Sequence, residues 1–268
     1  MSERLDVFLT LRGDVKSRER AKQLIKNGFV SVNGKECRKP AMSINVSDEV
    51  ICSDDGMCFV GRGGLKLDFA CKAFQLDLYD MVCADIGAST GGFTQCMLEH
   101  GAKLVYAIDV GHGQLDESLC SDPNVINCEG VNARELTPEF FGRKLDFISG
   151  DLSFISLKLV THALTECLKS GGDMVLLIKP QFEAGKQALN KKGIVKNQKD
   201  HIRVITELVQ FFQLSGLTAK DLIASPVQGG DGNVEYLIYL NKSEPTVDFL
   251  NRFDVKSFVS DSFSRFKC

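Results

Sequence analysis

The sequence predicts an α/β protein with a doubly wound, mostly parallel β-sheet, preceded by a small α+β domain. Three observations support this prediction. A buried strand at residues 81–86 runs into a glycine-rich turn and a helix, later strands alternate with helical patterns, and the first 45 residues are basic. The later strands are expected at residues 104–108, 125–128, 147–149, 174–178, 222–224 and 236–240, with helices at 157–168 and 201–214. Alternation of strands and helices is typical of a parallel sheet with helices on both faces.

Length and composition fit two domains with a hydrophobic core. The chain has 268 residues, of which 44% are hydrophobic and 25% charged, and both fractions are ordinary for a globular protein. No apolar run approaches the roughly 20 residues that span a bilayer, and the amino-terminus has no signal-peptide pattern. We therefore expect a cytoplasmic protein with no membrane insertion.

The ten cysteines occur singly along the chain. None forms a C-x-x-C pair, and no group of cysteines and histidines has the spacing of metal ligands. We interpret them as reduced thiols, most of which act as small core residues. The sequence therefore predicts no bound metal.

Charge is distributed unevenly between the head and the body of the chain. Residues 1–45 carry ten Lys/Arg against five Asp/Glu, whereas residues 46–268 carry 22 against 30. A basic head on an acidic body favours a polyanionic partner for the head. A solvated surface would give the same composition, so charge alone leaves both interpretations open.

The head has the pattern of a helix followed by a hairpin. Ser17 can cap a helix over residues 18–27, and Gly28 can end it in the left-handed conformation. A strand pattern follows, and the pair Asn33-Gly34 is a strong signal for a hairpin turn.

Basic side chains on this helix and beside this turn suit the phosphates of a structured RNA, which proteins recognise largely by shape and charge. The motifs at residues 4–6, 17–21, 25–28 and 30–34 resemble the S4 RNA-binding domain. The candidate RNA contacts are Arg4, Lys16, Arg18, Arg20, Lys22, Lys35 and Arg62.

A nucleotide-type site follows the strand at residues 81–86. Residues 87–92 form a glycine-rich turn before a helical pattern, and such turns let backbone N–H groups approach a ligand. Ser89 interrupts the G-x-G-x-x-G fingerprint of dinucleotide sites, and the G-K-[ST] of a phosphate-binding loop is absent. Asp85 would repel a pyrophosphate but suits the amine of a methionine moiety.

A second carboxylate completes the candidate cofactor site. Asp109 ends the next predicted strand, where a carboxylate can bind ribose hydroxyls. The pattern resembles the S-adenosylmethionine site of class I methyltransferases, whose fold is Rossmann-like; the alternative is a purely structural turn in another α/β protein. The candidate cofactor-binding residues are Asp85, Gly87, Ala88, Ser89, Thr90, Gly91, Gly92, Phe93, Asp109, Val110 and Asp151.

Four charged residues are expected at the carboxyl-terminal edge of the sheet, where the working residues of such sheets lie. Lys66 follows a glycine-rich run, Asp151 and Lys179 each end a predicted strand, and Glu235 opens the last one. Two lysines and two carboxylates beside a methyl-donor site favour methylation of a ribose 2′-hydroxyl.

Lys179 is the best candidate for the base, because its strand is apolar and burial or a neighbouring cation lowers the pKa of a lysine. Lys66 would supply that cation, while Asp151 and Glu235 would orient the amine. Taken singly, these residues also have structural interpretations: solvated lysines, a helix cap at Asp151 and an edge charge at Glu235.

Longer motifs extend the resemblance from about Arg4 to Leu240. The chain resembles the hemolysin-A type of ribosomal RNA 2′-O-methyltransferase, an S4 domain joined to an FtsJ-like domain. FtsJ-like enzymes use a Lys-Asp-Lys-Glu tetrad, which falls on the four charged residues. The resemblance implies that Glu129 and Asn132 lie near the adenosine, and that the substrate is a cytidine of ribosomal RNA. The motifs lie at residues 61–67, 85–94, 106–115, 151–157, 178–185 and 232–236.

The same resemblance implies the domain limits. We expect an S4-type RNA-binding domain at 1–59, a linker at 60–66, an S-adenosylmethionine-dependent methyltransferase domain at 67–242 and a tail at 243–268. Two alternatives remain, a membrane-active hemolysin and an RNA-binding or ribosome-assembly factor with an inactive body. The phenylalanine spacing of the tail predicts a packing helix, through Phe249, Phe253, Phe258, Phe263 and Phe266.

Overall fold

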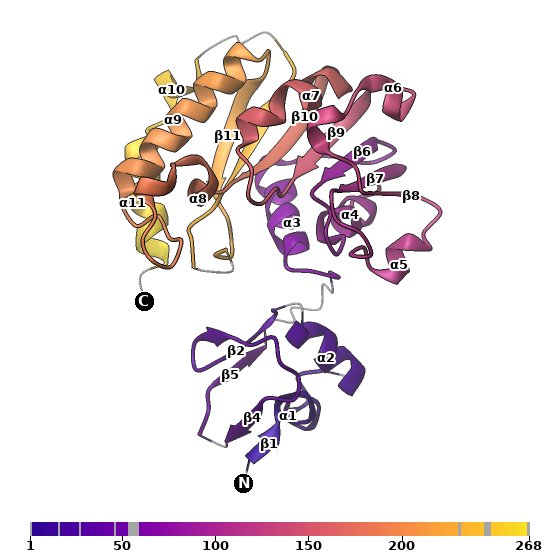
Figure 1. Cartoon of the computed structure of the whole chain (residues 1–268), viewed down its shortest axis with the longest axis vertical. Helices are drawn as coiled ribbons and strands as arrows, with labels where there is room; N and C mark the ends of the chain where they lie inside the picture. The colour runs from indigo at the N-terminus through magenta and orange to yellow at the C-terminus, as the bar shows by residue number, and fades with distance from the viewer. Residues whose placement is uncertain are drawn as a thin grey trace. The chain divides into compact units, whose positions relative to one another are not determined.

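The chain folds into two compact units that divide between Gly64 and Leu65 (Figure 1). Lys16, one of the predicted RNA contacts, lies outside the described residues. The predicted domain limits stay predictions, although a helix that crosses this division already begins at Gly63, inside the predicted linker. The computed structural model describes residues 2–15, 17–26, 28–45, 47–52, 59–229, 232–243 and 248–266.

The first unit is a small α+β domain. Helices α1 and α2 pack against each other, β2 pairs with β3 and β5, and β1 pairs with β4, all antiparallel. Leu5, Leu24 and Ile25 are fully buried between these elements. The elements are β1 (Ser2–Arg4), α1 (Leu5–Arg12), α2 (Arg18–Lys26), β2 (Val30–Val32), β3 (Lys35–Glu36), β4 (Ser43–Asn45) and β5 (Val50–Cys52).

Local signals in the sequence of the head correspond to observed caps and turns. The Ser17 hydroxyl accepts a hydrogen bond from the backbone N–H of Arg20 at 3.2 Å, which caps helix α2. Gly28 ends the helix with φ 81°. Asn33 and Gly34 both have positive φ, 52° and 72°, as a two-residue hairpin turn requires. These three predictions are confirmed.

Two of the arginines predicted to contact RNA form ion pairs with a buried carboxylate. Arg4 donates to both oxygens of Asp6 at 3.0 and 2.9 Å, and Arg18 donates to one of them at 3.1 Å. Asp6 is fully buried, while the two arginine side chains are about half exposed. The hydrogen bond from Arg4, opposed by burial and aided by Arg18, lowers the pKa of Asp6 from its ordinary value of 3.8 to about 2.

This ion pair predicts acid sensitivity of the first unit. Because the pKa of Asp6 is lower in the folded protein than in the unfolded chain, the ionised carboxylate stabilises the fold. This contribution is present above pH 3.8 and is lost as the pH falls toward 2. Asp6→Asn should lower the free energy of unfolding at pH 7 and flatten its decline over that window. Chemical denaturation at several pH values measures both effects. Asp14→Asn, which spares the Asp6 contacts, should keep the wild-type decline, and an equal slope in Asp6→Asn contradicts the prediction.

The second unit is built on a seven-stranded sheet of order β11-β12-β10-β9-β6-β7-β8. Strand β12 runs antiparallel to β10 and β11, and the other pairings are parallel. The mostly parallel sheet expected from the sequence is therefore confirmed. The strands are β6 (Val82–Ile86), β7 (Leu104–Asp109), β8 (Val125–Glu129), β9 (Leu145–Gly150), β10 (Leu168–Ile178), β11 (Thr218–Ala224) and β12 (Tyr236–Asn241).

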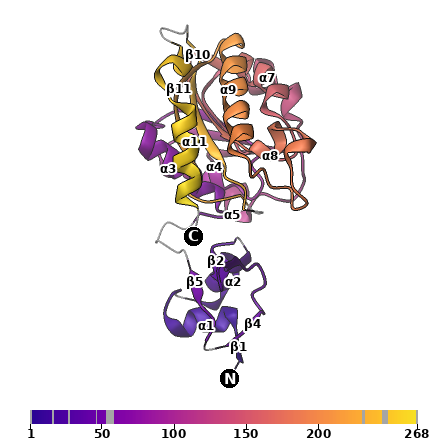
Figure 2. The ribbon, with the colours of Figure 1, turned by 90° about the vertical axis from the view of Figure 1, so that its left-hand side faces the viewer.

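Helices cover both faces of this sheet, with α3 and α4 on one side and α7 and α9 on the other (Figure 2). The helix predicted over 157–168 is interrupted at Val160 into η2 and α7. The helices are α3 (Gly63–Phe74), α4 (Gly92–Glu99), α5 (Glu117–Cys120), η1 (Ala133–Glu135), α6 (Pro138–Phe141), η2 (Leu157–Leu159), α7 (Thr161–Cys167), α8 (Pro180–Glu183), η3 (Lys186–Ala188), α9 (Gln198–Leu214), α10 (Phe249–Arg252) and α11 (Val255–Arg265).

The tail forms a helix that packs on the core of the second unit. Val255 and Val259 of α11 are buried in the main hydrophobic cluster, and α11 contacts α9. The ring of Phe258 lies 5.5 Å from that of Tyr236 on the sheet, measured between centroids. The packing helix predicted from the phenylalanine spacing is thus observed.

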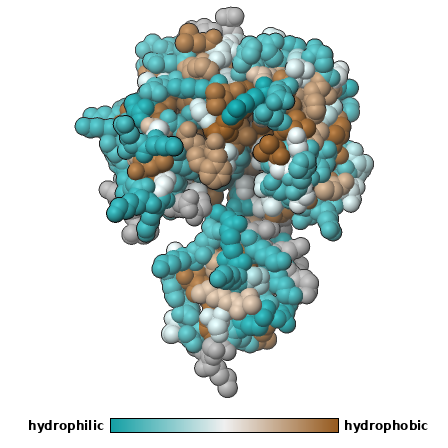
Figure 3. Space-filling view, viewed as in Figure 1, coloured by the Kyte–Doolittle hydropathy of each residue, from teal (hydrophilic) through white to brown (hydrophobic). Residues whose placement is uncertain are grey.

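Hydrophobic side chains on the visible surface are interspersed among hydrophilic ones (Figure 3). Among the described residues, no helix is both long and apolar enough to cross a membrane.

The sheet has a switch point between β6 and β9. From β6 the chain proceeds outward through β7 and β8, and then returns to β9 on the other side of β6. Ile86 and Gly150 pair at the carboxyl ends of these two strands. Ligands of open α/β sheets bind in the crevice at such a point, so the fold itself indicates where the functional site lies.

Candidate active site

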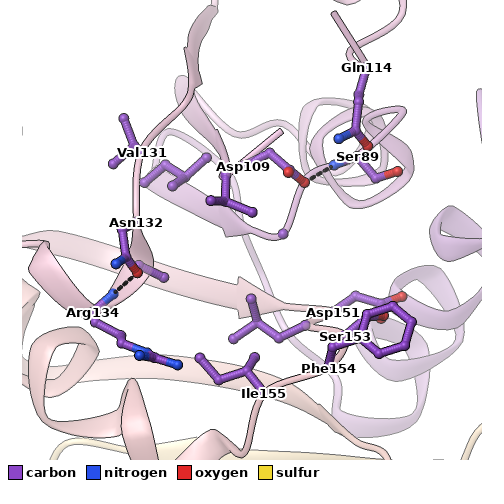
Figure 4. A pocket seen from close by; sticks show the side chains of 15 residues that line it. Ser89, Asp109, Gln114, Val131, Asn132, Arg134, Asp151, Ser153, Phe154 and Ile155 are labelled. Atoms are coloured by element: carbon purple, nitrogen blue, oxygen red, sulfur yellow. Dashed lines mark hydrogen bonds between the residues drawn. The ribbon is translucent and has the colours of Figure 1, made fainter. Parts of the chain in front are cut away.

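A cavity of about 540 Å³ opens at this switch point (Figure 4). Its volume falls within the range of small-molecule and cofactor sites. Loops after β6, β7, β8 and β9 supply its wall, so the parallel strands bring together segments that are far apart in the sequence. The lining residues are Gly87, Ser89, Ile108, Asp109, Val110, Gln114, Val131, Asn132, Ala133, Arg134, Asp151, Leu152, Ser153, Phe154 and Ile155.

The glycine turn brings the backbone of β6 against that of β9. Gly87 has φ 83°, and a Cβ atom added to it would lie 2.8 Å from the carbonyl oxygen of Asp151. Only glycine combines this backbone conformation with so close an approach. A side chain here would also push the chain away from the cavity wall, so Gly87 sets both the turn and the shape of the pocket.

Asp109 is held rigidly at the cavity. One carboxylate oxygen accepts from the backbone N–H of Ser89 at 2.9 Å, and the other accepts from the N–H of Gly111 at 2.8 Å. Figure 4 shows the first of these bonds. Each carboxylate oxygen has a further lone pair. Asp109 can therefore accept hydrogen bonds from the hydroxyls of a bound sugar without giving up its backbone contacts.

Asp85 lies beneath the turn and is fully buried. One oxygen accepts from the N–H and the hydroxyl of Thr94, both at 2.8 Å, which satisfies a donor of the first turn of α4. The other oxygen has no hydrogen-bond partner among the described residues. Burial, only partly offset by the Thr94 bonds, raises the pKa of Asp85 to about 7.

Glu129 and Asn132 have different positions. The Glu129 carboxylate accepts from the backbone N–H groups of Gly113, Gln114 and Leu115, and these bonds lower its pKa to about 2. It thereby fixes the loop after β7 and does not line the cavity. Asn132 lines the cavity, and its side chain caps η1 by accepting from the N–H of Arg134.

The predicted cofactor-binding residues divide into two groups by position. Those in the lining are Gly87, Ser89, Asp109, Val110, Asn132 and Asp151. Those outside the lining are Asp85, Ala88, Thr90, Gly91, Gly92, Phe93 and Glu129.

The four charged residues singled out by the sequence converge beside this cavity. Lys179 follows β10 and Glu235 precedes β12, and because Ile178 pairs with Tyr236 the two lie at the same sheet edge. The lysine nitrogens contact the carboxylates as follows: Lys66 Nζ to Glu235 Oε2 at 2.8 Å and to Asp151 Oδ2 at 3.6 Å, and Lys179 Nζ to Asp151 Oδ1 at 2.6 Å.

These four side chains form a largely buried, charge-balanced cluster. Exposed fractions are 10% for Lys66, 11% for Lys179, 20% for Asp151 and 2% for Glu235. Burial opposes the charged form of Asp151, but the two lysines outweigh it, so the pKa of this carboxyl falls below its ordinary value. Gln181 also donates to Glu235, at 3.2 Å. Such a network holds each group in one orientation.

Comparison with known proteins assigns the family. The FtsJ-like methyltransferase family matches residues 59–242, and the S4 domain family matches residues 3–50. The chain belongs to the FtsJ-like methyltransferases. The prediction of an S4 domain joined to a Rossmann-like methyltransferase is therefore confirmed.

Relatives of this FtsJ-like methyltransferase are similar over most of their length. The 16S/23S rRNA (cytidine-2′-O)-methyltransferase TlyA of Mycobacterium tuberculosis is 41% identical over 88% of this chain and 89% of its own. Hemolysin A of Brachyspira hyodysenteriae is 36% identical over 88% and 98%. A solved chain from Streptococcus thermophilus, 40% identical, superposes with a TM-score of 0.78 and covers 99% of this chain and 97% of its own.

Two residues of the methyltransferase cavity were missed by sequence reasoning. Ser153 accepts a hydrogen bond from Lys179 Nζ at 2.8 Å. Phe154 is 91% exposed, has φ 63°, and its ring centroid lies 5.0 Å from that of Phe182. A left-handed backbone costs a non-glycine residue about 1–2 kcal/mol. The available signal was their place in the motif at residues 151–157, beside a candidate catalytic residue.

Proposed function

We propose that this FtsJ-like methyltransferase transfers a methyl group from S-adenosylmethionine to the 2′-hydroxyl of a cytidine in ribosomal RNA. The observation that carries the proposal is the ion-paired cluster of Lys66, Asp151, Lys179 and Glu235 beside the switch-point cavity. Family membership supports methyl transfer, and the S4 domain supports an RNA or ribosomal substrate. Similarity to the Mycobacterium tuberculosis enzyme supports the cytidine ribose.

The cavity residues fit S-adenosylmethionine. Asp109 would accept hydrogen bonds from the ribose hydroxyls, and Asn132 would contact the adenosine. Asp85 lies beneath the turn, outside the cavity lining, and its second oxygen, which has no hydrogen-bond partner among the described residues, would accept from the ammonium group of the methionine moiety. When bound, the cofactor supplies an electrophilic methyl group on a sulfonium. The remaining chemistry, which is to hold the hydroxyl in line and remove its proton, falls to the protein.

In the proposed mechanism Lys179 first releases a proton to solvent, so that its neutral amine can contact the ribose 2′-hydroxyl. This amine then takes up the hydroxyl proton as the hydroxyl oxygen bonds the methyl group that the cofactor would supply. Asp151, 2.6 Å from Lys179 Nζ, holds that amine in place. Lys66 contacts both carboxylates, so it links the Asp151–Lys179 pair to Glu235. The exposed ring of Phe154 offers a surface on which a nucleobase can stack.

Labelled methyl transfer tests this function directly. Incubation of the purified chain and labelled cofactor with each ribosomal subunit and with naked ribosomal RNA should label one of them, at a cytidine ribose located by mapping 2′-O-methylation. Label on a base, or on a ribose other than that of cytidine, overturns the acceptor. No incorporation with cofactor bound favours an RNA-binding factor with an inactive body.

Arg18 and Lys22, two basic residues on helix α2 of the S4 domain, give a further prediction. Arg18→Ala with Lys22→Ala should weaken RNA binding and reduce the slope of log affinity against log salt by about 0.7–0.9 for each lost phosphate contact. Fluorescence anisotropy at several salt concentrations measures the slope. Lys103→Ala, an exposed lysine of the second unit paired with Asp80, is the control. An unchanged slope in the double variant means that these cations form only a solvated face.

A further inference from the structure

Three metal-ligand side chains converge outside the cavity. Cys71 of α3, Cys96 of α4 and His100, which caps the end of α4, place one ligand atom each within 4.8 Å of the other two. None of the three lines the cofactor cavity. Cys71 precedes Cys96 by 25 residues, and Cys96 and His100 are four residues apart, so no C-x-x-C spacing indicated them. The packing of α3 beside α4 on one sheet face brings them together.

Two thiols and an imidazole form a ligand set that favours zinc. Zinc binds sulfur at about 2.3 Å and imidazole nitrogen at about 2.0–2.1 Å in tetrahedral geometry. Ligand atoms of such a tetrahedron lie roughly 3.5 Å apart, so the observed cluster needs only small side-chain movements to close on an ion. Thiolate and imidazole ligands together select zinc over the oxygen-preferring magnesium and calcium.

A carboxylate orients the imidazole. Asp68 Oδ1 lies 3.1 Å from His100 Nε2, and the other Asp68 oxygen is 2.6 Å from Lys72 Nζ. If Nε2–H donates to Asp68, Nδ1 carries the free lone pair and is the nitrogen open to a metal. Histidine ligands of metals typically donate their second ring nitrogen to a carboxylate in this way.

We propose that Cys71, Cys96 and His100 bind one Zn²⁺ ion, with Asp68 holding the histidine. Both cysteines are buried, whereas the His100 side chain is 25% exposed, which gives the ion a route from solvent and leaves a fourth position for water. The ion would join α3, which carries Lys66, to α4, which follows the cofactor turn. It would therefore stabilise the methyltransferase domain without taking part in the reaction.

Metal titration of the full-length, tag-free protein tests this proposal. The reduced and chelator-treated chain should bind one Co²⁺ with the visible absorption of tetrahedral thiolate coordination, and Zn²⁺ should displace it. Zn²⁺ should raise the unfolding temperature of the wild type. His100→Ala should lose the cobalt spectrum and the thermal shift. Asp68→Asn should weaken Zn²⁺ binding about 10- to 100-fold.

Matched variants separate this site from chance binding. His162→Ala and Cys120→Ser alter an exposed histidine and an exposed cysteine elsewhere, and both should bind as the wild type does. Cys96→Ser should lose the thiolate absorption, and His100→Ala serves the same purpose if that variant fails to fold. Absent binding, binding unchanged in His100→Ala, or a Cys71–Cys96 disulfide that persists in the reduced sample by mass spectrometry would each overturn the proposal.

Discussion

Lys179→Ala should abolish methyl transfer to RNA while leaving the affinity for S-adenosylmethionine close to that of the wild type. Lys179 Nζ contacts Asp151 and Ser153 and does not line the cofactor cavity. Its proposed partner is the ribose hydroxyl and not the methyl donor. Loss of a positioned proton acceptor lowers the rate about 10²- to 10⁴-fold, so the rate of methyl transfer should fall at least about 10²-fold.

The measurement has two parts. Single-turnover transfer of a labelled methyl group gives the rate of the chemical step, and calorimetric titration gives the cofactor affinity. Lys169→Ala is a matched control, because Lys169 lies near the start of the same strand and is paired with Asp146 at 2.5 Å. It should react at the wild-type rate. Wild-type turnover in Lys179→Ala would sink the assignment, and an equal loss in both variants would mean that the effect is structural.

The sheet and the position of its functional edge were accessible from the sequence because the strands are apolar and evenly spaced. Every strand predicted in the body occurs, with ends that shift by up to six residues, the largest shift being at the start of β10. Asp151 and Lys179 each follow a strand and Glu235 precedes one. Parallel strands end at one edge of a sheet, so adjacency to a strand end was enough to predict that Asp151 and Lys179 converge. Glu235 joins them because β12 runs antiparallel to β10 and begins at that edge. The distances from Lys66 to Asp151 and Glu235 could not be predicted, because they depend on how α3, which carries Lys66, packs against the sheet.

Acidic residues near the turn show where sequence reasoning stops. Asp85 is the penultimate residue of β6, and Asp109 and Glu129 end β7 and β8. Glu129, however, accepts from three backbone N–H groups, and Asp85 accepts from the N–H of Thr94 in the first turn of α4. A carboxylate that accepts hydrogen bonds from backbone N–H groups and a carboxylate that is free to bind a ligand look alike in the sequence, because both are acidic residues at the end of a strand. Only the hydrogen-bond partners distinguish them, and those require coordinates.

Contacts between helices were also beyond the sequence pattern. The interruption at Val160 places Leu157–Leu159 in a separate 3₁₀ turn, and the carboxylate of Glu183 ties that turn to α8 through Ser156 and Leu157. The cluster of Cys71, Cys96 and His100 arises in the same way from helix packing. Periodicity identifies which face of a helix is buried, but it does not identify the residues of other elements against which that face packs.

Gly87→Ala should remove most of the cofactor affinity and the activity together, unlike Lys179→Ala. Gly87 has φ 83°, where a Cβ atom costs about 1–2 kcal/mol in backbone strain alone. The added atom would also lie 2.8 Å from the carbonyl oxygen of Asp151, so β6 and the segment after β9 must separate. That movement widens the cavity and pulls Asp151 from Lys179. If this displacement of the cavity wall weakens cofactor binding by about 1.4 kcal/mol or more, the affinity falls at least tenfold.

Gly142→Ala isolates the backbone contribution, because Gly142 has φ 65° and no atom within 4 Å of an added Cβ. It should lower the free energy of unfolding by about 1–2 kcal/mol and leave cofactor affinity unchanged. Denaturant unfolding and calorimetric titration of both variants separate strain from the clash. If Gly87→Ala loses no more than Gly142→Ala in either measurement, the close approach of the turn to Asp151 does not shape the site. A loss of affinity confined to Gly87→Ala ties the cofactor cavity to that contact.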